Sequence, residues 1–197
     1  MSEKLLFLCY LIFDMQPMNS QKILLHCCCA PCAAPILEWL QANDYAVTLY
    51  FYNPNIYPQE EYLIRKNELI KYAGQLGLPI VDDDYCHDEW LQCIAGLEQE
   101  KERGGRCLQC FKMRLLATAR MAERLHIPQI ATTLASSRWK SLAQIEEAGS
   151  WAVAQVKDVQ FWAKNWRKDG LQERRRILLA ENNFYNQLYC GCEFSIK

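Results

Sequence analysis

Cysteine is the residue type with the most chemistry in this chain, which holds 11 cysteines in 197 residues. Most of them fall in three short motifs: CCCAPC at residues 27–32, CLQC at residues 107–110 and CGC at residues 190–192. The count is odd, and consecutive cysteines cannot all bridge one another, so the spacing does not suit a framework of paired structural disulfides. We infer metal or redox chemistry in a reducing compartment, and we expect a cytoplasmic protein.

The three motifs together could supply the ligands of one metal site. A C-x-x-C pair brings two thiolates within reach of one metal, and four thiolates suit tetrahedral zinc or a [4Fe–4S] cluster. CAPC at residues 29–32 also looks like a thioredoxin-type dithiol. Three interpretations therefore stay open: a catalytic iron–sulfur enzyme, a zinc-stabilised RNA-binding module without redox activity, and a thiol–disulfide oxidoreductase. The surplus of thiols over a closed four-ligand site favours the first.

The other reactive side chains carry less information. We expect His26, at a strand end, to be a hydrogen-bonded structural residue, and we assign no role to His87 or His126. The sequence contains no glycine-rich dinucleotide fingerprint and no Walker A motif, which argues against a tightly bound nucleotide. We predict ordinary buried side chains for the cysteines that no spacing argument covers, which are Cys9, Cys27, Cys86 and Cys93.

Strands and helices alternate along the first two thirds of the chain. Expected strands cover residues 22–26, 46–52, 80–81 and 129–134, and expected helices cover residues 33–43, 59–77, 88–97 and 110–125. This pattern predicts an α/β fold with a Rossmann-like, doubly wound parallel sheet. Ligands of such sheets bind beyond the carboxyl ends of the strands. CCCAPC, expected as a loop, falls at such an end, as do YNPN (52–55) and TTLASS (132–137).

The predicted organisation is one α/β domain over residues 22–197, preceded by an N-terminal extension over residues 1–21. The apolar run at residues 5–13 is far too short to span a bilayer and has no signal-peptide cleavage pattern, so we expect no membrane partner. The formal net charge is −1, but it is unevenly distributed. Residues 82–102 carry eight acids against one lysine, whereas the helical, basic C-terminal segment carries seven Lys or Arg against three acids over residues 157–176.

Five segments carry a resemblance to a known family. They are HCCCAPC (26–32), YFYNPNIYPQEEY (50–62), RCLQCFKMRL (106–115), ATTLASSRWK (131–140) and YCGCEFS (189–195). With these segments the chain resembles the QueH-type, cobalamin-independent epoxyqueuosine reductases over nearly everything after Lys22. It departs from them at residues 84–86, where the family tends to carry Asp-Tyr-Asp and this chain reads Asp-Tyr-Cys. The resemblance implies two-electron deoxygenation of epoxyqueuosine to queuosine at the tRNA wobble position, the last step of queuosine biosynthesis.

The resemblance also implies a set of cofactors and partners. A redox-active disulfide is implied for Cys190 and Cys192, and a second, mononuclear iron is expected beside the cluster, with Cys32 as its obvious thiol. The expected partners are a tRNA that carries epoxyqueuosine and an unidentified electron donor. Deoxygenating an epoxide takes two electrons, which a dithiol can store. The implied ligands of the [4Fe–4S] cluster are Cys28, Cys29, Cys107 and Cys110.

A tRNA substrate gives the basic segment at residues 157–176 a second interpretation. The segment interleaves aromatic side chains with lysine and arginine, which predicts a track for tRNA phosphates that includes Arg174, Arg175 and Arg176. Without the resemblance, a solvated basic helix with core aromatics would be the better interpretation.

Overall fold

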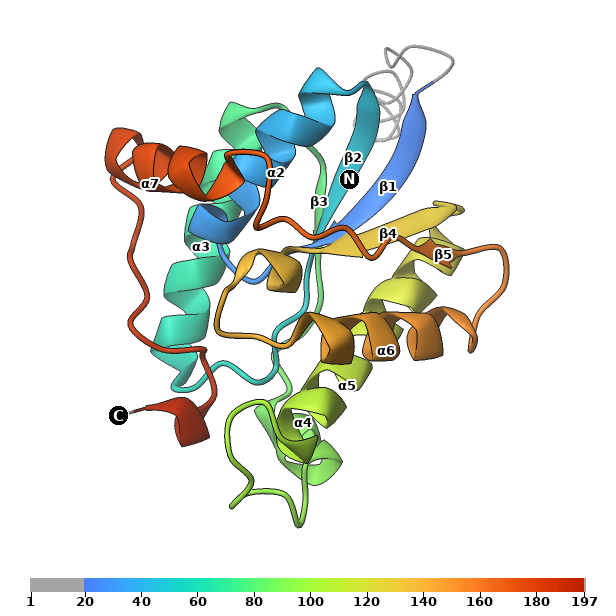
Figure 1. Cartoon of the computed structure of the whole chain (residues 1–197), viewed down its shortest axis with the longest axis vertical. Coiled ribbons are helices and arrows are strands. Elements are labelled where there is room, and N and C mark those ends of the chain that lie inside the picture. Colours follow the sequence, from blue (N-terminus) through green and yellow to red (C-terminus); the bar gives the residue numbers. More distant parts are fainter. Residues whose placement is uncertain (1–19, 197) are drawn as a thin grey trace, which may run out of the picture.

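Five parallel strands form one sheet in the order β3-β2-β1-β4-β5 (Figure 1). The computed structural model describes residues 20–196, so Cys9 and residues 1–19 of the predicted extension lie outside the described residues. β2 and β3 lie on one side of β1, and β4 and β5 lie on the other side. This order confirms the doubly wound α/β prediction. The strands are β1 (Gln21–His26), β2 (Tyr45–Phe51), β3 (Ile80–Asp82), β4 (Gln129–Thr132) and β5 (Gln160–Phe161).

Helices cover both faces of this sheet. Figure 1 shows α2, α3 and α7 on one side and α5 and α6 on the other. α2 packs on α7, and α5 packs on α6. No helix among residues 20–196 is long and apolar enough to cross a membrane. The helices are α2 (Ala30–Ala42), α3 (Gln59–Gln75), α4 (His87–Cys93), α5 (Gly105–Arg124), α6 (Leu142–Val153) and α7 (Leu171–Glu181), with 3-10 turns at η1 (Thr133–Ser136) and η2 (Glu193–Ser195).

The core is centred on β1, which has neighbours on both sides. Ile23, Leu24 and Leu25 are fully buried, because a central parallel strand is covered on both faces and reads as a continuous apolar run. β1 pairs in register with β2 along its whole length, and its end pairs with β4 through His26 and Thr132. The strand ends that carry the motifs are therefore held side by side by the best-packed part of the molecule.

Two helix starts differ from the prediction, and both concern cysteines. CCCAPC is not a loop throughout, because α2 begins at Ala30 and places Cys32 in its first turn. Pro31 suits this place, since the first turn of a helix does not use the N–H that proline lacks. α5 begins at Gly105, so Cys107 and Cys110 also lie in the first turns of a helix. Both motifs are thus attached to rigid helix N-termini.

The basic segment at residues 157–176 is not a single helix, because it contains β5 and a loop before α7. Trp166 is buried and packs edge-on against Trp162 and against Trp39 of α2, and the Trp162 ring is tilted against that of Trp39. The ammonium of Lys164 lies 4.1 Å from the centre of the Trp39 ring. These tryptophans belong to the core, as the alternative interpretation expected, and are not free to stack on RNA.

Candidate metal and redox site

Three buried thiols meet where β1 passes into α2. The Sγ atoms of Cys28, Cys29 and Cys32 all lie within 4.8 Å of one another, and those of Cys28 and Cys29 are 3.7 Å apart. Cys29 is the N-cap of α2, so the positive end of the helix dipole favours negative charge on these sulfurs. A compact set of thiolates fits a soft metal ion or an iron–sulfur cluster. We call Cys28, Cys29 and Cys32 the cysteine triad.

The thiols of the cysteine triad are not equivalent. The pKa of Cys28 is lowered well below its usual value because the thiols of Cys29 and Cys32 donate hydrogen bonds to its sulfur. Burial raises the pKa of Cys29 well above the usual value. Cys28 is therefore the first of the three thiols to lose its proton.

The end of β4 supports Cys28 from the neighbouring strand. The hydroxyl of Thr133 accepts a hydrogen bond from the Cys28 amide at 3.1 Å and donates one to its sulfur at 3.3 Å. His26 Nδ1 lies 2.8 Å from the Thr132 hydroxyl oxygen, and His26 Nε2 lies 3.2 Å from the Tyr52 carbonyl oxygen. Burial lowers the pKa of His26 to about 3, so the ring is neutral. The structural role predicted for His26 is confirmed, and TTLASS meets CCCAPC as expected.

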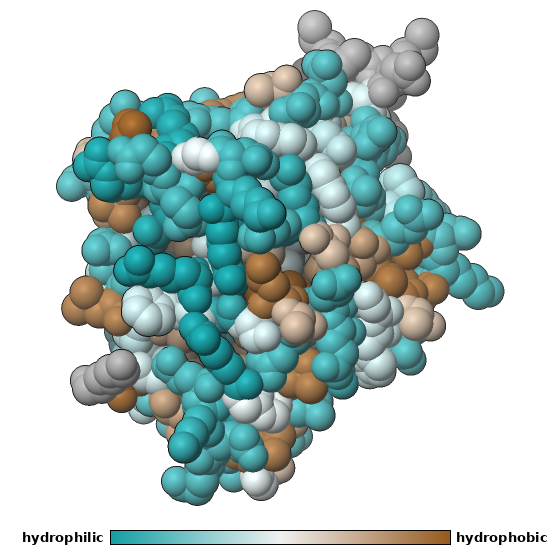
Figure 2. Space-filling view, in the orientation of Figure 1, coloured by the Kyte–Doolittle hydropathy of each residue, from teal (hydrophilic) through white to brown (hydrophobic). Residues whose placement is uncertain are grey.

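A pocket of about 920 Å³ lies beside the triad. Cys28, Cys32 and Cys190 all line it, so residues from both ends of the chain face one space. Hydrophilic residues dominate this face of the molecule in Figure 2, and hydrophobic ones lie in small separate groups. The lining suits an anionic ligand, because it holds four cations against one acid: Arg65, Arg138, Lys140 and Arg175 against Glu102.

Lys140 is the lysine of this lining, and its charge interacts with the cysteine sulfurs. It is half-buried in the pocket, and no described residue accepts a hydrogen bond from its ammonium. Burial alone would lower its pKa, but electrostatic attraction to the sulfurs of Cys190, Cys28 and Cys32 raises the pKa above the usual lysine value. Lys140 therefore keeps its proton and faces both thiol groups.

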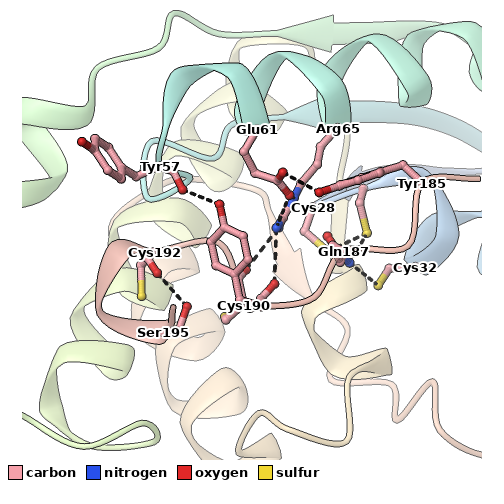
Figure 3. Close-up of polar contacts among 12 residues, drawn as sticks. Cys28, Cys32, Tyr57, Glu61, Arg65, Tyr185, Gln187, Cys190, Cys192 and Ser195 are labelled. Atoms are coloured by element: carbon pink, nitrogen blue, oxygen red, sulfur yellow. Dashed lines mark hydrogen bonds and ion pairs between the residues drawn. The ribbon is translucent and has the colours of Figure 1, made fainter. Parts of the chain in front are cut away.

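The C-terminal segment, residues 184–196, runs across the pocket and is held by α3 (Figure 3). The Arg65 guanidinium donates hydrogen bonds to the carbonyl oxygens of Tyr189 and Cys190, both at 3.3 Å. Glu61 orients Arg65 through an ion pair of 2.6 Å. The amide of Gln187 donates to the Cys29 sulfur at 2.9 Å and also reaches the Cys32 sulfur at 3.8 Å. The segment thus contacts the triad directly.

Cys190 and Cys192 are both free thiols, and the structure shows no disulfide among residues 20–196. Cys190 is exposed, whereas burial raises the pKa of Cys192 to about 11. Gly191 between them has a φ of +126°, and a Cβ there would lie 3.1 Å from the Arg65 guanidinium and from Ile56. Only glycine combines this backbone conformation with this close approach.

The four predicted cluster ligands come from two segments, the end of β1 with the start of α2, and the start of α5. Cys28 and Cys29 share the triad with Cys32, while Cys107 and Cys110 lie outside it on α5. Cys107 accepts a hydrogen bond from the Arg103 amide at 3.3 Å, and Cys110 packs in a small separate core that contains Cys192.

The start of α5 is nevertheless tied to the pocket. The Arg103 side chain donates to the carbonyl oxygens of Trp139 and Arg138, at 2.8 Å and 3.1 Å. Trp139 and Arg138 line the pocket together with Glu102, which directly precedes Arg103. The C-x-x-C motif therefore begins next to the rim of the pocket that Cys28 lines.

Other predicted residues have mixed outcomes. Cys27 is fully buried as predicted, whereas Cys86 and Cys93 are only half-buried. Of the three predicted phosphate-binding arginines, Arg174 pairs with Glu38 and Glu181, and Arg176 pairs with Glu173. Arg175 alone of the three lines the pocket.

Sequence reasoning missed several residues of the site. Lys140 and Trp139 lie inside the ATTLASSRWK segment, whose place after a strand is a signal that could have found them. Gln187 is 158 positions from Cys29, and no local pattern links the two. Arg114 is also buried and donates to Asn53, which in turn donates to the Cys27 carbonyl oxygen and ties YNPN to β1.

Comparison with known proteins adds what the geometry leaves open. The model of the family "Epoxyqueuosine reductase QueH" matches residues 23–197. The chain belongs to the epoxyqueuosine reductase QueH family. Epoxyqueuosine reductase QueH of Haemophilus influenzae is 42% identical over 181 residues, which are 92% of this chain and 74% of that protein. The Acinetobacter baylyi protein of the same name is 40% identical over 92% of this chain and 83% of its own length. The Thermotoga maritima protein of that name is 32% identical over 88% of this chain and 90% of its own length.

Membership in the epoxyqueuosine reductase QueH family confirms the resemblance and the prediction of an oxidoreductase. It does not favour the zinc-stabilised RNA-binding module or the general thiol–disulfide oxidoreductase. The matched residues include the whole pocket lining and all three cysteine motifs.

Proposed function

We propose that this chain reduces epoxyqueuosine in tRNA to queuosine, the last step of queuosine biosynthesis. One observation carries the proposal: in a member of the QueH family, Cys28 and Cys32 of the cysteine triad face the same cationic pocket as Cys190. The reaction breaks both carbon–oxygen bonds of the epoxide and leaves a carbon–carbon double bond. It consumes two electrons and two protons, and the oxygen leaves as water.

We assign Cys28, Cys29, Cys107 and Cys110 as ligands of a [4Fe–4S] cluster, and Cys32 as the thiol of an additional mononuclear iron. The closeness of Cys28, Cys29 and Cys32 supports a cluster held next to an additional iron. The hydrogen bond from Arg103 to the pocket rim supports the inclusion of Cys107 and Cys110, which follow Arg103 in the chain. When bound, the cluster supplies electrons one at a time and the additional iron supplies a Lewis acid. The amide of Gln187 donates to the sulfurs that hold these groups.

Cys190 and Cys192 store the two electrons that one turnover needs. Closing a disulfide between them releases two electrons and two protons, and an external electron donor then restores the two thiols. The exposure of Cys190 lets it meet such a donor, while the burial of Cys192 keeps the second thiol protonated until the bridge forms. A disulfide across a single glycine is strained, which makes it easy to reduce again.

Lys140 delivers a proton to the departing epoxide oxygen. Its ammonium faces the pocket and donates no hydrogen bond to a described residue, so the proton is available to a bound substrate. The positive charge also steadies the negative charge that develops on the oxygen as its bonds to carbon break.

The cationic lining binds the anionic substrate. We propose that Arg175 contacts a tRNA phosphate, because it lines the pocket and has no ion-pair partner among the described residues. A tRNA substrate and a thiol-based mechanism both suit the cytoplasm, which we propose as the location.

Conversion of the nucleoside tests the proposed function. Protein reconstituted with iron and sulfide without oxygen is incubated with dithionite and with tRNA that carries epoxyqueuosine, and the nucleosides are identified by mass spectrometry. We expect queuosine to form and the mass to fall by one oxygen. Equal amounts of queuosine with metal-free protein, or none with iron-loaded protein, would contradict the proposal.

Serine variants test the ligand assignment. Replacing Cys28, Cys29, Cys107 or Cys110 is expected to remove the brown colour and most of the iron, whereas Cys32→Ser should lose only the additional iron. Cys86→Ser is the matched control, since Cys86 is half-buried outside the triad and the pocket. A colourless wild-type protein that holds stoichiometric zinc after anaerobic reconstitution would show that the cluster assignment is wrong.

A further inference from the structure

An exposed aromatic side chain stands at the rim of the pocket. We propose that Trp139, backed by Arg138, is a stacking platform for the tRNA base next to the modified nucleotide. This inference rests on the proposed function, because it takes tRNA as the substrate. Trp139 is 66% exposed, and both residues line the pocket that Cys28 and Cys190 share.

The platform is held in place although its ring is exposed. The Arg138 guanidinium lies 5.0 Å from the centre of the Trp139 ring. Arg103 donates to the carbonyl oxygens of Trp139 and Arg138, which fixes the backbone under the ring. The Trp139 amide also lies 3.4 Å from the Ser137 hydroxyl oxygen, to which it donates. A ring with a fixed backbone and an open face loses little freedom when a base stacks on it.

The surroundings of the platform match a nucleic acid. Arg175 lines the same pocket, so the phosphate backbone beside a stacked base would meet positive charge. Aromatic rings beside a cationic track are the way in which proteins bind unpaired nucleotides. Leu188, which is 91% exposed, lines the pocket from the C-terminal segment and offers a second apolar surface.

The position of the platform indicates which base stacks on it. Cys28, Cys32 and Cys190 line the pocket, so the wobble nucleotide must enter the pocket to bring its epoxide to these thiols. Its neighbours in the anticodon loop then remain at the rim, where the open face of Trp139 lies. The platform therefore contacts an unmodified base and contributes to binding whether or not the epoxide is present.

Equilibrium binding of tRNA tests this inference. Trp139→Ala should weaken binding by about 5- to 150-fold, the effect of losing one stacked base, while Trp139→Phe should keep most of the affinity. Trp151→Ala is the matched control, since Trp151 is 39% exposed, has Lys112 over its ring and lies on α6 outside the pocket. Iron content of each variant shows that the site is intact.

Two tRNAs separate this inference from the proposed function. The same loss of affinity is expected for tRNA with epoxyqueuosine and for tRNA with guanosine at the wobble position. A 2-aminopurine next to that position should be quenched by wild-type protein and by Trp151→Ala, but not by Trp139→Ala. Unchanged binding by Trp139→Ala, or a loss confined to the modified tRNA, would overturn the platform even if conversion proceeds. If wild-type protein quenches the probe but forms no queuosine, the platform stands and the proposed function falls.

Discussion

The thiols of this protein have different surroundings, and these suit the different roles that we propose for them. Cys28 carries negative charge readily because its neighbours donate to its sulfur, which suits a metal ligand. Cys190 is exposed and Cys192 is buried with a pKa raised to about 11, which suits a pair that exchanges electrons and is not permanently charged. The proposal thus uses cysteine sulfur in two ways, as a metal ligand and as an electron store.

The amide of Gln187 is predicted to tune the potential of the bound cluster. Hydrogen bonds to the sulfurs stabilise the more negative, reduced state, so Gln187→Leu should lower the reduction potential without removing iron. A spectroscopic redox titration measures the shift. Gln172→Leu is the control, because Gln172 lines the same pocket but its amide donates to the Ser136 carbonyl oxygen. An equal potential in Gln187→Leu and wild type would show that this contact does not reach the cluster.

Replacing Lys140 should separate proton delivery from binding. Lys140→Met is expected to lower kcat by about 100-fold or more, the usual contribution of a positioned proton donor, while tRNA affinity changes by only a few fold. Lys140→Arg keeps the charge but holds its proton more firmly, so it should restore affinity fully and kcat only in part. Saturation kinetics with quantified queuosine distinguish these cases. A kcat of Lys140→Met close to that of wild type would exclude the proposed role.

The C-terminal segment is the element that completes the site. Arg65 of α3, held by Glu61, secures the backbone at residues 189–190, and Gln187 joins the segment to the triad. Cys190 therefore reaches the pocket because of contacts made by an element more than a hundred residues away in the chain.

Gly191→Val should release this segment. A valine at a φ of +126° is strained by about 1–3 kcal/mol, and its side chain would collide with Arg65 and Ile56. We expect faster cleavage of residues 184–196 in limited proteolysis, together with slower turnover and an unchanged iron content. Gly74→Ala in α3 is the control, because nothing lies within 4 Å of a Cβ added there. Cleavage of Gly191→Val at the wild-type rate would show that the segment is held by other contacts.

The elements were predictable where the sequence is apolar and periodic. The buried strands β1 and β2 follow the prediction to within one residue, since burial on both faces leaves a continuous apolar run. β5 has only two residues and no such run, so the sequence of the basic segment does not predict a strand there. The predicted start of α5 is too late, because the buried Arg106 side chain donates to the carbonyl oxygens of Glu98 and Glu100, contacts that no periodicity reveals.

At the scale of the molecule, the sheet explains why motifs far apart in sequence form one site. CCCAPC and TTLASS follow β1 and β4, which are neighbours at the point where the strand order reverses. That convergence was predictable. The closeness of the Cys32 sulfur to those of Cys28 and Cys29 was not predictable, because it depends on α2 starting at Ala30. The docking of Gln187 was not predictable either, because it depends on tertiary contacts of the C-terminal segment.

The charge of the whole pocket should govern tRNA affinity. Arg175→Gln is predicted to weaken tRNA binding and to reduce the slope of log K against log salt by about 0.7–0.9, the value for one phosphate contact. Arg176→Gln on the same helix is the control, because Arg176 is paired with Glu173 outside the pocket. Titrations at several salt concentrations give the slopes. If Arg176→Gln changes the slope and Arg175→Gln does not, tRNA lies along the outside of α7 and not in the pocket.

A single turnover without an external donor tests the central claim most directly. Iron-loaded protein, fully reduced and freed of reductant, is mixed without oxygen with tRNA that carries epoxyqueuosine, and both queuosine and free thiols are counted. We predict one queuosine per protein and the loss of two thiols, mapped to a Cys190–Cys192 disulfide. The Cys190→Ser, Cys192→Ser double variant should keep its iron, bind tRNA and form no queuosine. Queuosine formed with every thiol still free would contradict the account.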